Sequence, residues 1–164
     1  MRVTINVKRT FLGTVLVYLL IACSAQAVQK TPATPPAKAK CPVCGMFVGK
    51  YPDWVCSMTF RDSTSVYFDG PKDLFTFYLD PGKYVPARKQ TDIADIHVKD
   101  YYSLAVIDGR RAFYVIGGNV LGPMGKELVP FAGKDDAEGF MRDHRGVKIL
   151  HFTEITRSVL KGLE

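Results

Sequence analysis

The chain has 164 residues, of which 47% are hydrophobic, 12% aromatic and 23% charged, with 22 Lys and Arg against 16 Asp and Glu. This modest charge and high aromatic content exclude an intrinsically disordered protein. A polytopic membrane protein is also excluded, because the sequence has only one long apolar run. Four cysteines are too few for a disulfide-dense scaffold. The net charge is +6, but the basic residues do not form a stripe interleaved with aromatic residues. Nucleic acid is therefore not an expected partner.

The N-terminus has the features of an export signal. Three basic residues and no acid occupy residues 1–10, and the apolar run that follows, residues 11–21, is too short to span a bilayer comfortably. Cys23 ends a Leu-Ile-Ala-Cys sequence, the form of a bacterial lipobox, so we expect residues 1–22 to be a lipoprotein signal peptide and Cys23 to be lipidated. Cleavage after Ala27, in an Ala-Gln-Ala sequence, is the alternative and would give a soluble periplasmic protein.

Residues 23–40 are rich in Pro, Ala and Lys and contain no aromatic residue. Because this composition favours extended backbone without a packed core, we predict a lipid-anchored flexible tether. The folded, metal-binding domain is predicted over residues 41–164. The export signal then places the protein in the bacterial cell envelope, on the periplasmic side of a membrane.

One internal repeat is visible within the predicted domain. Four identities recur at an offset of 63 residues: Phe68 and Phe131, Gly70 and Gly133, Asp73 and Asp136, Phe77 and Phe140. Each copy has the pattern of a strand, a glycine and a helix with an acidic first turn. We therefore predict an α+β fold made of two repeated β-β-α-β units, over about residues 47–101 and 102–155.

The expected elements follow this repeat along the chain. Strands are predicted at residues 54–60, 65–68, 97–101, 111–116, 128–131 and 147–152. Helices are predicted to begin after Gly70 and after Gly133, and to end before Pro81 and near residue 145. Residues 82–94 break the repeat and are predicted to form a loop, whereas residues 101–107 are predicted to extend a strand shared between the halves.

The strongest chemical motif is Cys-Pro-Val-Cys-Gly-Met at residues 41–46. Two cysteines three positions apart can place both sulfurs on one metal ion or join in a disulfide. This spacing is compatible with a zinc site formed by Cys41, Cys44, Cys56 and one histidine. It is also compatible with a redox-active pair of Cys41 and Cys44. Cys56 shares a predicted strand face with Met58, so we expect core packing for both side chains.

A second unusual segment, residues 117–125, contains four glycines and ends in Gly-Pro-Met-Gly. Met124 has no helical face to fill in such a loop. Thiolate and thioether sulfurs are soft ligands, and together they select Cu(I) over zinc, calcium or magnesium. Cys44, Met46 and Met124 are therefore candidate ligands of a Cu(I) site of low coordination number.

These motifs resemble the NosL family of bacterial copper-binding accessory lipoproteins in their order and spacing. The resemblance covers about residues 41–155 and rests on these segments: Cys44-Gly45-Met46, Asp100-Tyr101, Ala112-Phe113-Tyr114-Val115 and Pro123-Met124-Gly125. It implies two β-β-α-β units, Cu(I) ligands at Cys44, Met46 and Met124, and delivery of copper to nitrous oxide reductase or its maturation complex. Cys41 departs from the simplest family pattern, and it is a candidate additional ligand or disulfide partner.

The leading interpretation is a non-enzymatic, periplasm-facing Cu(I) metallochaperone that delivers copper to a copper enzyme by sulfur ligand exchange. The Cys44 thiolate would supply most of the affinity, and the neutral thioethers of Met46 and Met124 would be displaced easily. One alternative is a thiol-disulfide redox protein acting through Cys41 and Cys44. The other is a small interaction module stabilised by zinc.

Overall fold

The structure is a computed structural model and describes residues 34–164. The predicted signal peptide, the two candidate cleavage positions and the candidate lipidation residue Cys23 lie outside the described residues. Within residues 34–164, no helix combines the length and the apolar character needed to cross a membrane.

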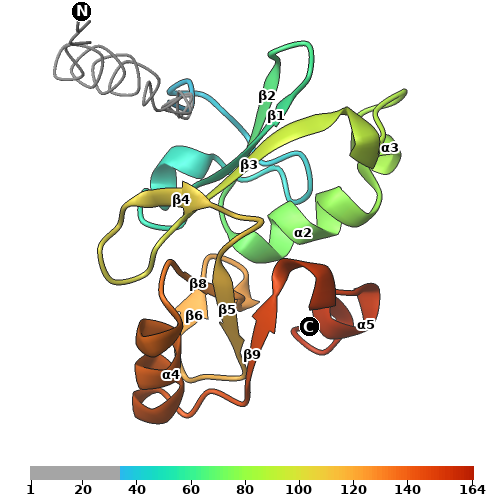
Figure 1. The fold of residues 1–164 in the computed structure, drawn as a ribbon. Coiled ribbons are helices and arrows are strands. Elements are labelled where there is room, and N and C mark those ends of the chain that lie inside the picture. Colours follow the sequence, from blue (N-terminus) through green and yellow to red (C-terminus); the bar gives the residue numbers. More distant parts are fainter. Residues whose placement is uncertain (1–33) are drawn as a thin grey trace, which may run out of the picture. The chain divides into compact units, whose positions relative to one another are not determined.

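The first half of the domain is built on a four-stranded antiparallel sheet with the order β2-β1-β3-β4 (Figure 1). Its strands are β1 (Cys56–Phe60), β2 (Ser65–Phe68), β3 (Ile93–Lys99) and β4 (Val106–Asp108). The inner strand β1 is buried along its whole length, and Cys56 and Met58 are 1% and 0% exposed. The core packing predicted for these two side chains is confirmed.

Helix α2 (Pro71–Leu79) follows β2 directly and contacts both β1 and β2. Gly70 caps it in an extended conformation, and Pro71 in the first turn has the fixed φ that favours a helix start. Its buried side chains include Leu74, Phe75 and Phe77. The helix ends before Pro81, where the short helix α3 (Pro81–Tyr84) begins.

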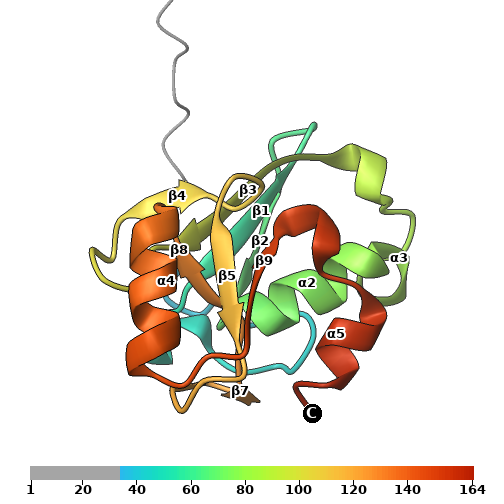
Figure 2. The same cartoon turned by 60° about the horizontal axis from the view of Figure 1, so that its bottom comes forward.

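The second half contains a three-stranded antiparallel sheet with the order β8-β5-β9. Its strands are β5 (Phe113–Ile116), β8 (Val129–Phe131) and β9 (Lys148–His151). Helix α4 (Lys134–Asp143) packs against all three strands, as Figure 2 shows, and buries Ala137 and Phe140. A separate hairpin of β6 (Leu121–Gly122) and β7 (Gly125–Lys126) lies within the connection from β5 to β8.

Three short 3-10 turns and a C-terminal helix complete the domain. The turns are η2 (Val48–Lys50), η3 (Gln90–Asp92) and η4 (Phe152–Glu154). The terminal helix α5 (Arg157–Lys161) lies beside α2 (Figure 2), and the side chain of Thr156 caps its N-terminus by accepting a hydrogen bond from Val159 N.

Aromatic contacts and hydrogen bonds join the two halves. Phe75 of α2 packs edge-on against Tyr114 of β5, with ring centroids 5.1 Å apart. Asp100, at the end of β3, accepts a hydrogen bond from Ala132 N at 2.8 Å, and Tyr101 N donates to Pro130 O at 2.9 Å. These contacts connect the end of the first sheet to the end of β8 and to the start of α4.

The predicted α+β class is confirmed. The order β2-β1-β3 in the first sheet matches β8-β5-β9 in the second, and each strand-glycine-helix segment occurs at the repeat positions. That the halves are two copies of one unit, over residues 47–101 and 102–155, stays a prediction.

Two local predictions were wrong. Residues 82–94 do not form one loop, because they contain most of α3, the turn η3 and the first residues of β3. Residues 101–107 do not extend β3, because the Asp100 carboxylate accepts hydrogen bonds from Tyr102 N and Ser103 N and turns the chain. The backbone of Leu104 is also in the left-handed region, at φ 57°, and β4 starts only at Val106.

The ordered domain also begins before the predicted boundary at Cys41. Val48 N donates to Ala39 O at 3.1 Å, and Lys40 pairs with Phe47 in an antiparallel bridge. The last residues assigned to the tether are thus part of the fold, because they pair with the chain that leaves the cysteine-rich turn.

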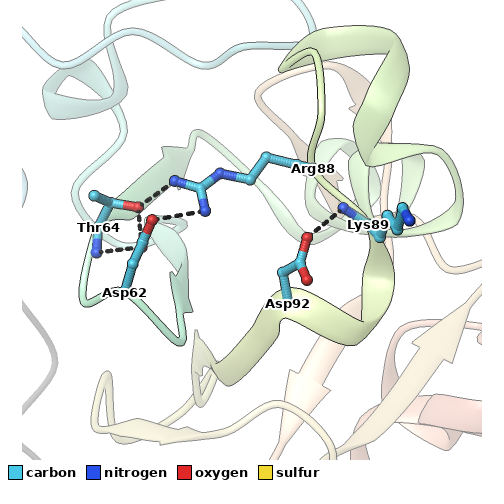
Figure 3. A network of polar contacts seen from close by, with 5 residues as sticks. All are labelled: Asp62, Thr64, Arg88, Lys89 and Asp92. Atoms are coloured by element: carbon cyan, nitrogen blue, oxygen red, sulfur yellow. Dashed lines mark hydrogen bonds and ion pairs between the residues drawn. The ribbon is translucent and has the colours of Figure 1, made fainter.

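A polar network closes the connection from β1 to β2 (Figure 3). Asp62 accepts hydrogen bonds from the backbone N and the hydroxyl of Thr64, at 3.0 and 2.6 Å. Arg88, from the segment before η3, lies 2.8 Å from the Asp62 carboxylate and donates to the Thr64 hydroxyl. These contacts hold the short turn close to the neighbouring loop.

Candidate metal centre

Residues 41–46 form a tight turn. Cys41 N donates to Met46 O at 2.8 Å, and Gly45 N donates to Cys41 O at 2.9 Å. Gly45 has a φ of 79°, which glycine adopts without the steric cost that a Cβ atom would add. The glycine of Cys-Gly-Met thus suits the backbone of the turn, and the residues on either side of it carry the sulfur atoms.

Two carboxylates from another part of the chain face this turn. Asp69 lies directly after β2, and Asp73 lies in the first turn of α2. The Cys41 thiol donates to Asp73 Oδ2 at 3.2 Å, and the Cys44 thiol donates to Asp69 Oδ1 at 3.4 Å. One ligand atom from each of the four residues lies within 4.8 Å of the other three. The structure therefore brings together two thiols and two carboxylates in a set that could hold a metal ion.

Burial determines the protonation of this group. Cys41, Asp69 and Asp73 are buried, whereas Cys44 is partly exposed. Burial raises the pKa of Cys41 far above its ordinary value, and burial together with the Asp73 carboxylate raises the pKa of Cys44 to about 11. Burial also raises the pKa of Asp73. Both thiols are therefore neutral in the metal-free protein, and a bound cation has to displace their protons.

The two candidate methionines differ in how far their side chains are exposed to solvent. Met46 is partly exposed, and its Sδ accepts a long hydrogen bond of 4.0 Å from the Tyr51 hydroxyl. Met124 occupies the two-residue turn of the β6–β7 hairpin with Pro123, and it is 43% exposed. Its carbonyl oxygen accepts a hydrogen bond of 2.6 Å from Lys72 Nζ. The hairpin that carries Met124 thus lies against the same helix start that carries Asp73.

Glu127 fastens this hairpin to α2. Its Oε1 accepts hydrogen bonds from Lys72 N at 2.5 Å and from Leu128 N at 2.9 Å. A Cβ atom at Gly70 would lie 2.6 Å from Glu127 Oε2, so a side chain there would have to displace the Glu127 carboxyl. Burial raises the pKa of Glu127 to about 8.

Sequence reasoning did not identify Asp69, Asp73 or Glu127 as site residues. Asp73 matched the ordinary acidic first turn of a helix, which compensates the helix dipole. One available signal was Asp69, because its repeat position in the second half is Ala132. An acid found in only one copy has no explanation in the repeat itself.

The zinc ligand set that the sequence left open as an alternative is not the set that the structure assembles. The Cys56 thiol donates to the carbonyl oxygen of Trp54 at 3.1 Å and is outside the four-residue group. None of the three histidines belongs to that group either. Cys41, Cys44 and Cys56 are all free thiols in the structure.

Fold and site together define a small α+β domain with a cysteine-rich turn and a candidate metal site at the start of its first long helix. The sequence matches the NosL family over residues 32–160, and the chain therefore belongs to the NosL family. The resemblance seen in its short motifs is confirmed.

Two solved structures and one curated relative are similar to this chain. The crystal structure of the copper chaperone NosL from Shewanella denitrificans matches with a TM-score of 0.66 and 28% identity, over 79% of this chain and 98% of that one. The solution structure of apo-NosL from Achromobacter cycloclastes matches with a TM-score of 0.46 and 25% identity, over 64% and 87%. The copper-binding lipoprotein NosL of Stutzerimonas stutzeri is 38% identical over 56 residues, an alignment that spans 34% of this chain and 29% of that protein.

Proposed function

We propose that this protein is a non-enzymatic carrier of Cu(I), with copper as its cargo. Cys44, Met46 and Met124 supply the three sulfur ligands, and Cys41 is an additional thiol at the same turn. The relatives described above are named as copper-binding and copper-chaperone proteins, and this supports copper as the cargo. Soft thiolate and thioether donors favour the Cu(I) state.

The observation that carries the proposal is the meeting of two distant sulfur segments at one helix start. Cys44 contacts Asp69, one residue before the cap of α2, and the Met124 carbonyl contacts Lys72 in the first turn of that helix. The segments are separated by about 80 positions in the sequence, so local chain geometry cannot account for the meeting. A site formed from both segments explains why a methionine occupies an exposed turn.

The exposure of the ligands fits transfer by stepwise ligand exchange. Cys41 is buried, Cys44 is partly exposed to solvent, and Met124 is the most exposed of the three. An acceptor can therefore approach from the Met124 side and replace a neutral thioether first, which requires no proton transfer. The Cys44 thiolate would release copper last, because it carries the charge and most of the affinity.

We further propose that the carrier works on the periplasmic side of a bacterial membrane, anchored through a lipid on Cys23. Its expected acceptor is nitrous oxide reductase or the complex that matures this enzyme. Cleavage after Ala27 would instead give a soluble periplasmic carrier, and the intact mass of the mature protein distinguishes these outcomes.

An anaerobic titration of the reduced protein with Cu(I), against a competing chelator, tests the ligand assignment. We expect Cys44→Ser to lower the affinity more than about 100-fold, because the loss of a direct ligand exceeds the 10- to 100-fold effect of losing an outer-shell partner. Met124→Ala should lower it by a smaller factor. Met141→Ala, on α4, is the matched methionine control and should leave the affinity unchanged. Equal affinities for the unaltered protein, Cys44→Ser and Met124→Ala would contradict the proposal.

A further inference from the structure

Positive charge is distributed unevenly between the N-terminal segment and the rest of the protein. Residues 23–52, from the candidate lipidation residue onward, contain four lysines and no acid. Residues 53–164 contain 15 Lys and Arg against 16 Asp and Glu, which gives a net charge of −1. The positive charge of the predicted mature chain is therefore concentrated where the tether joins the folded domain.

Three of these four lysines lie close together on the domain. Lys40 pairs with Phe47 in an antiparallel bridge, and its Nζ lies 4.9 Å from the centre of the Phe47 ring. Phe47 is also the N-cap of the turn η2, in which Lys50 N donates to Phe47 O at 3.1 Å. Side chains three positions apart in a 3-10 turn lie on the same side, so Lys50 and Phe47 share one side. Lys38 lies two positions before Lys40, in the turn that leads into the bridge.

These side chains are open to solvent, and the lysines have no ion-pair partner. Lys38, Lys40 and Lys50 are exposed, and Phe47 is 41% exposed. Among residues 34–164, no carboxylate oxygen lies within 4.0 Å of the three ammonium groups. The first acid of the chain is Asp53, three positions after Lys50. Unpaired lysines beside an exposed aromatic ring are the combination with which peripheral proteins contact anionic lipid headgroups.

We propose that Lys38, Lys40, Phe47 and Lys50 form a basic face that docks on an anionic phospholipid bilayer. The ammonium groups contact the headgroup phosphates, and the Phe47 ring enters the boundary between headgroups and acyl chains. The remainder of the domain, with its net charge of −1, is not attracted to the same surface. The charge distribution therefore orients the domain as well as attracting it.

The length of the tether favours the bilayer over a protein partner as the occupant of this face. On the lipid anchor proposed above, ten residues separate Cys23 from Thr34, where the described residues begin. A segment of this length spans at most about 40 Å when fully extended. The basic face starts four positions later, at Lys38, so it meets the anchoring bilayer at a high effective concentration. The anchor supplies this proximity, whereas the affinity of the face for anionic lipid does not depend on it.

Docking would also fix the position of the sulfur-containing turn relative to the membrane. Met46 directly precedes Phe47, and Met46 O accepts a hydrogen bond from Cys41 N at 2.8 Å. Both ends of the 41–46 turn are thus joined to the docked segment. On the proposed function, the carrier would hold copper beside the membrane surface and present it to acceptors in that membrane.

Co-sedimentation with vesicles tests the affinity in the absence of a lipid anchor. The protein is the chain over residues 23–164 with Cys23→Ser, which prevents acylation and keeps every other residue. We expect it to sediment with vesicles that contain phosphatidylglycerol and not with vesicles of phosphatidylcholine alone. Binding should be lost at high salt, because the Debye length falls from about 10 Å at 0.1 M to about 3 Å at 1 M. Equal binding to the two kinds of vesicle, or binding to neither, would overturn the proposal.

Substitutions then assign the affinity to the basic face. Lys38→Gln, Lys40→Gln and Lys50→Gln should each lower the partition coefficient about five-fold, the contribution of one lysine at an anionic surface. Lys161→Gln, on α5, is the matched control, because it removes an exposed lysine that also lacks an ion pair. It should leave the partition coefficient nearly unchanged. A loss of the same size in Lys161→Gln would reduce the result to an effect of net charge and would overturn the basic face.

The depth of residue 47 provides an independent test. Trp54 is the only tryptophan of the chain, so Trp54→Phe combined with either Phe47→Trp or Val147→Trp leaves one fluorophore. Val147 is the matched control, because it is 76% exposed and lies in the other half of the domain. We expect vesicles of brominated phosphatidylglycerol to quench the fluorophore at position 47 and not the one at 147. Equal quenching at the two positions, or quenching at neither in the bound protein, would overturn the proposed orientation.

These results are separable from those for the proposed function. None of the substituted residues is a proposed copper ligand, so a failed Cu(I) titration would leave the vesicle measurements unaffected. The intact mass of the mature protein decides the lipid anchor, also without reference to the vesicles. A protein that binds Cu(I) as proposed but ignores anionic vesicles would overturn the docking face alone.

Discussion

The two halves of the domain differ most in the connection between their first two strands. In the first half, β1 and β2 are joined by a short turn that the Asp62, Thr64 and Arg88 network holds in place. In the second half, the connection from β5 to β8 runs over residues 117–128 and includes the hairpin that carries Met124. That hairpin lies against α2 of the first half. The candidate ligand is therefore supplied by an expanded loop, while the two sheets keep the same strand order.

The helix starts differ in a related way. Asp73 and Asp136 occupy equivalent positions in the first turns of α2 and α4, but Asp73 is 6% exposed and Asp136 is exposed to solvent. Only Asp73 has a thiol against it, that of Cys41. The same acid thus compensates a helix dipole in one half and faces a cysteine in the other, because the residue 41–46 turn contacts the start of α2 through Cys41 and Cys44.

The largest expected effect on stability comes from a core position that the two halves share. Phe77 and Phe140 are equivalent in the repeat, and both are fully buried. Phe77→Ala and Phe140→Ala should each lower the free energy of unfolding by about 3–5 kcal/mol, because each leaves a cavity in an aromatic cluster. Urea unfolding followed by near-UV circular dichroism measures both. A biphasic curve in which Phe140→Ala shifts only one phase would contradict a jointly folded core.

The next effect is a pH dependence of stability caused by Glu127, which connects the hairpin of the second half to α2 of the first half. Burial raises the pKa of Glu127 from 4.5 to about 8, so the folded protein binds its proton more tightly than the unfolded chain does. The contribution of the protonated Glu127 carboxyl to the free energy of unfolding is complete below pH 4.5 and is lost as the pH rises through about 8.

Glu127→Gln should remove this dependence while keeping an oxygen acceptor for Lys72 N. We expect the unfolding free energy of the unaltered protein to fall by up to about 1.4 kcal/mol per pH unit between pH 4.5 and 8, relative to that of Glu127→Gln. Denaturant unfolding at a series of pH values measures the difference. Parallel pH profiles for the two proteins would refute the assignment.

A smaller effect, with opposite signs in the two halves, sharpens the contrast between the helix starts. Burial raises the pKa of Asp73, so its stabilisation is lost as the pH rises, and Asp73→Asn should make the metal-free protein more stable at pH 8. Asp136→Asn should instead lower stability by about 0.3–1 kcal/mol, because a charge that complements the α4 dipole is lost. Thermal unfolding in the presence of a chelator compares the variants. Two changes of the same sign would remove the distinction.

The smallest effect is confined to the short turn of the first half. Hydrogen bonds from Thr64, and then the Arg88 guanidinium, lower the pKa of Asp62 to about 2. Thr64→Val should therefore raise the Asp62 pKa more than Arg88→Gln does, and neither should change metal affinity. An NMR titration of the Asp62 carboxyl carbon measures both shifts. A larger shift in Arg88→Gln would reverse the order of causes.

Much of the fold could be predicted because the sequence pattern is local. The strand over residues 65–68 and the starts of both helices follow directly from a strand-glycine-helix pattern and agree with the structure. The errors occur where side chains override the pattern. Asp100 turns the chain after β3 through hydrogen bonds to two backbone N–H groups, and no periodicity in residues 101–107 indicates that turn.

The candidate site could be predicted only on its sulfur side. Cys41 and Cys44 stand out by residue type and by their spacing, whereas Met124 as a ligand stays a prediction. Asp69 and Asp73 do not, because acids at a helix start are common, and only the packing of the 41–46 turn brings the thiols to them. Burial of a carboxylate depends on contacts between distant segments, and a single sequence does not record those contacts.

The contact of Glu127 with the start of α2 has a consequence for when copper can bind. The hairpin with Met124 contacts α2 only when the two halves are packed together, because Glu127 and the Met124 carbonyl accept hydrogen bonds from Lys72 of α2. On the proposed function, a half-folded chain would lack its outer thioether and would hold copper poorly. Loading with copper would thus require that both halves be folded, and a partly folded chain would neither hold the metal nor pass it on.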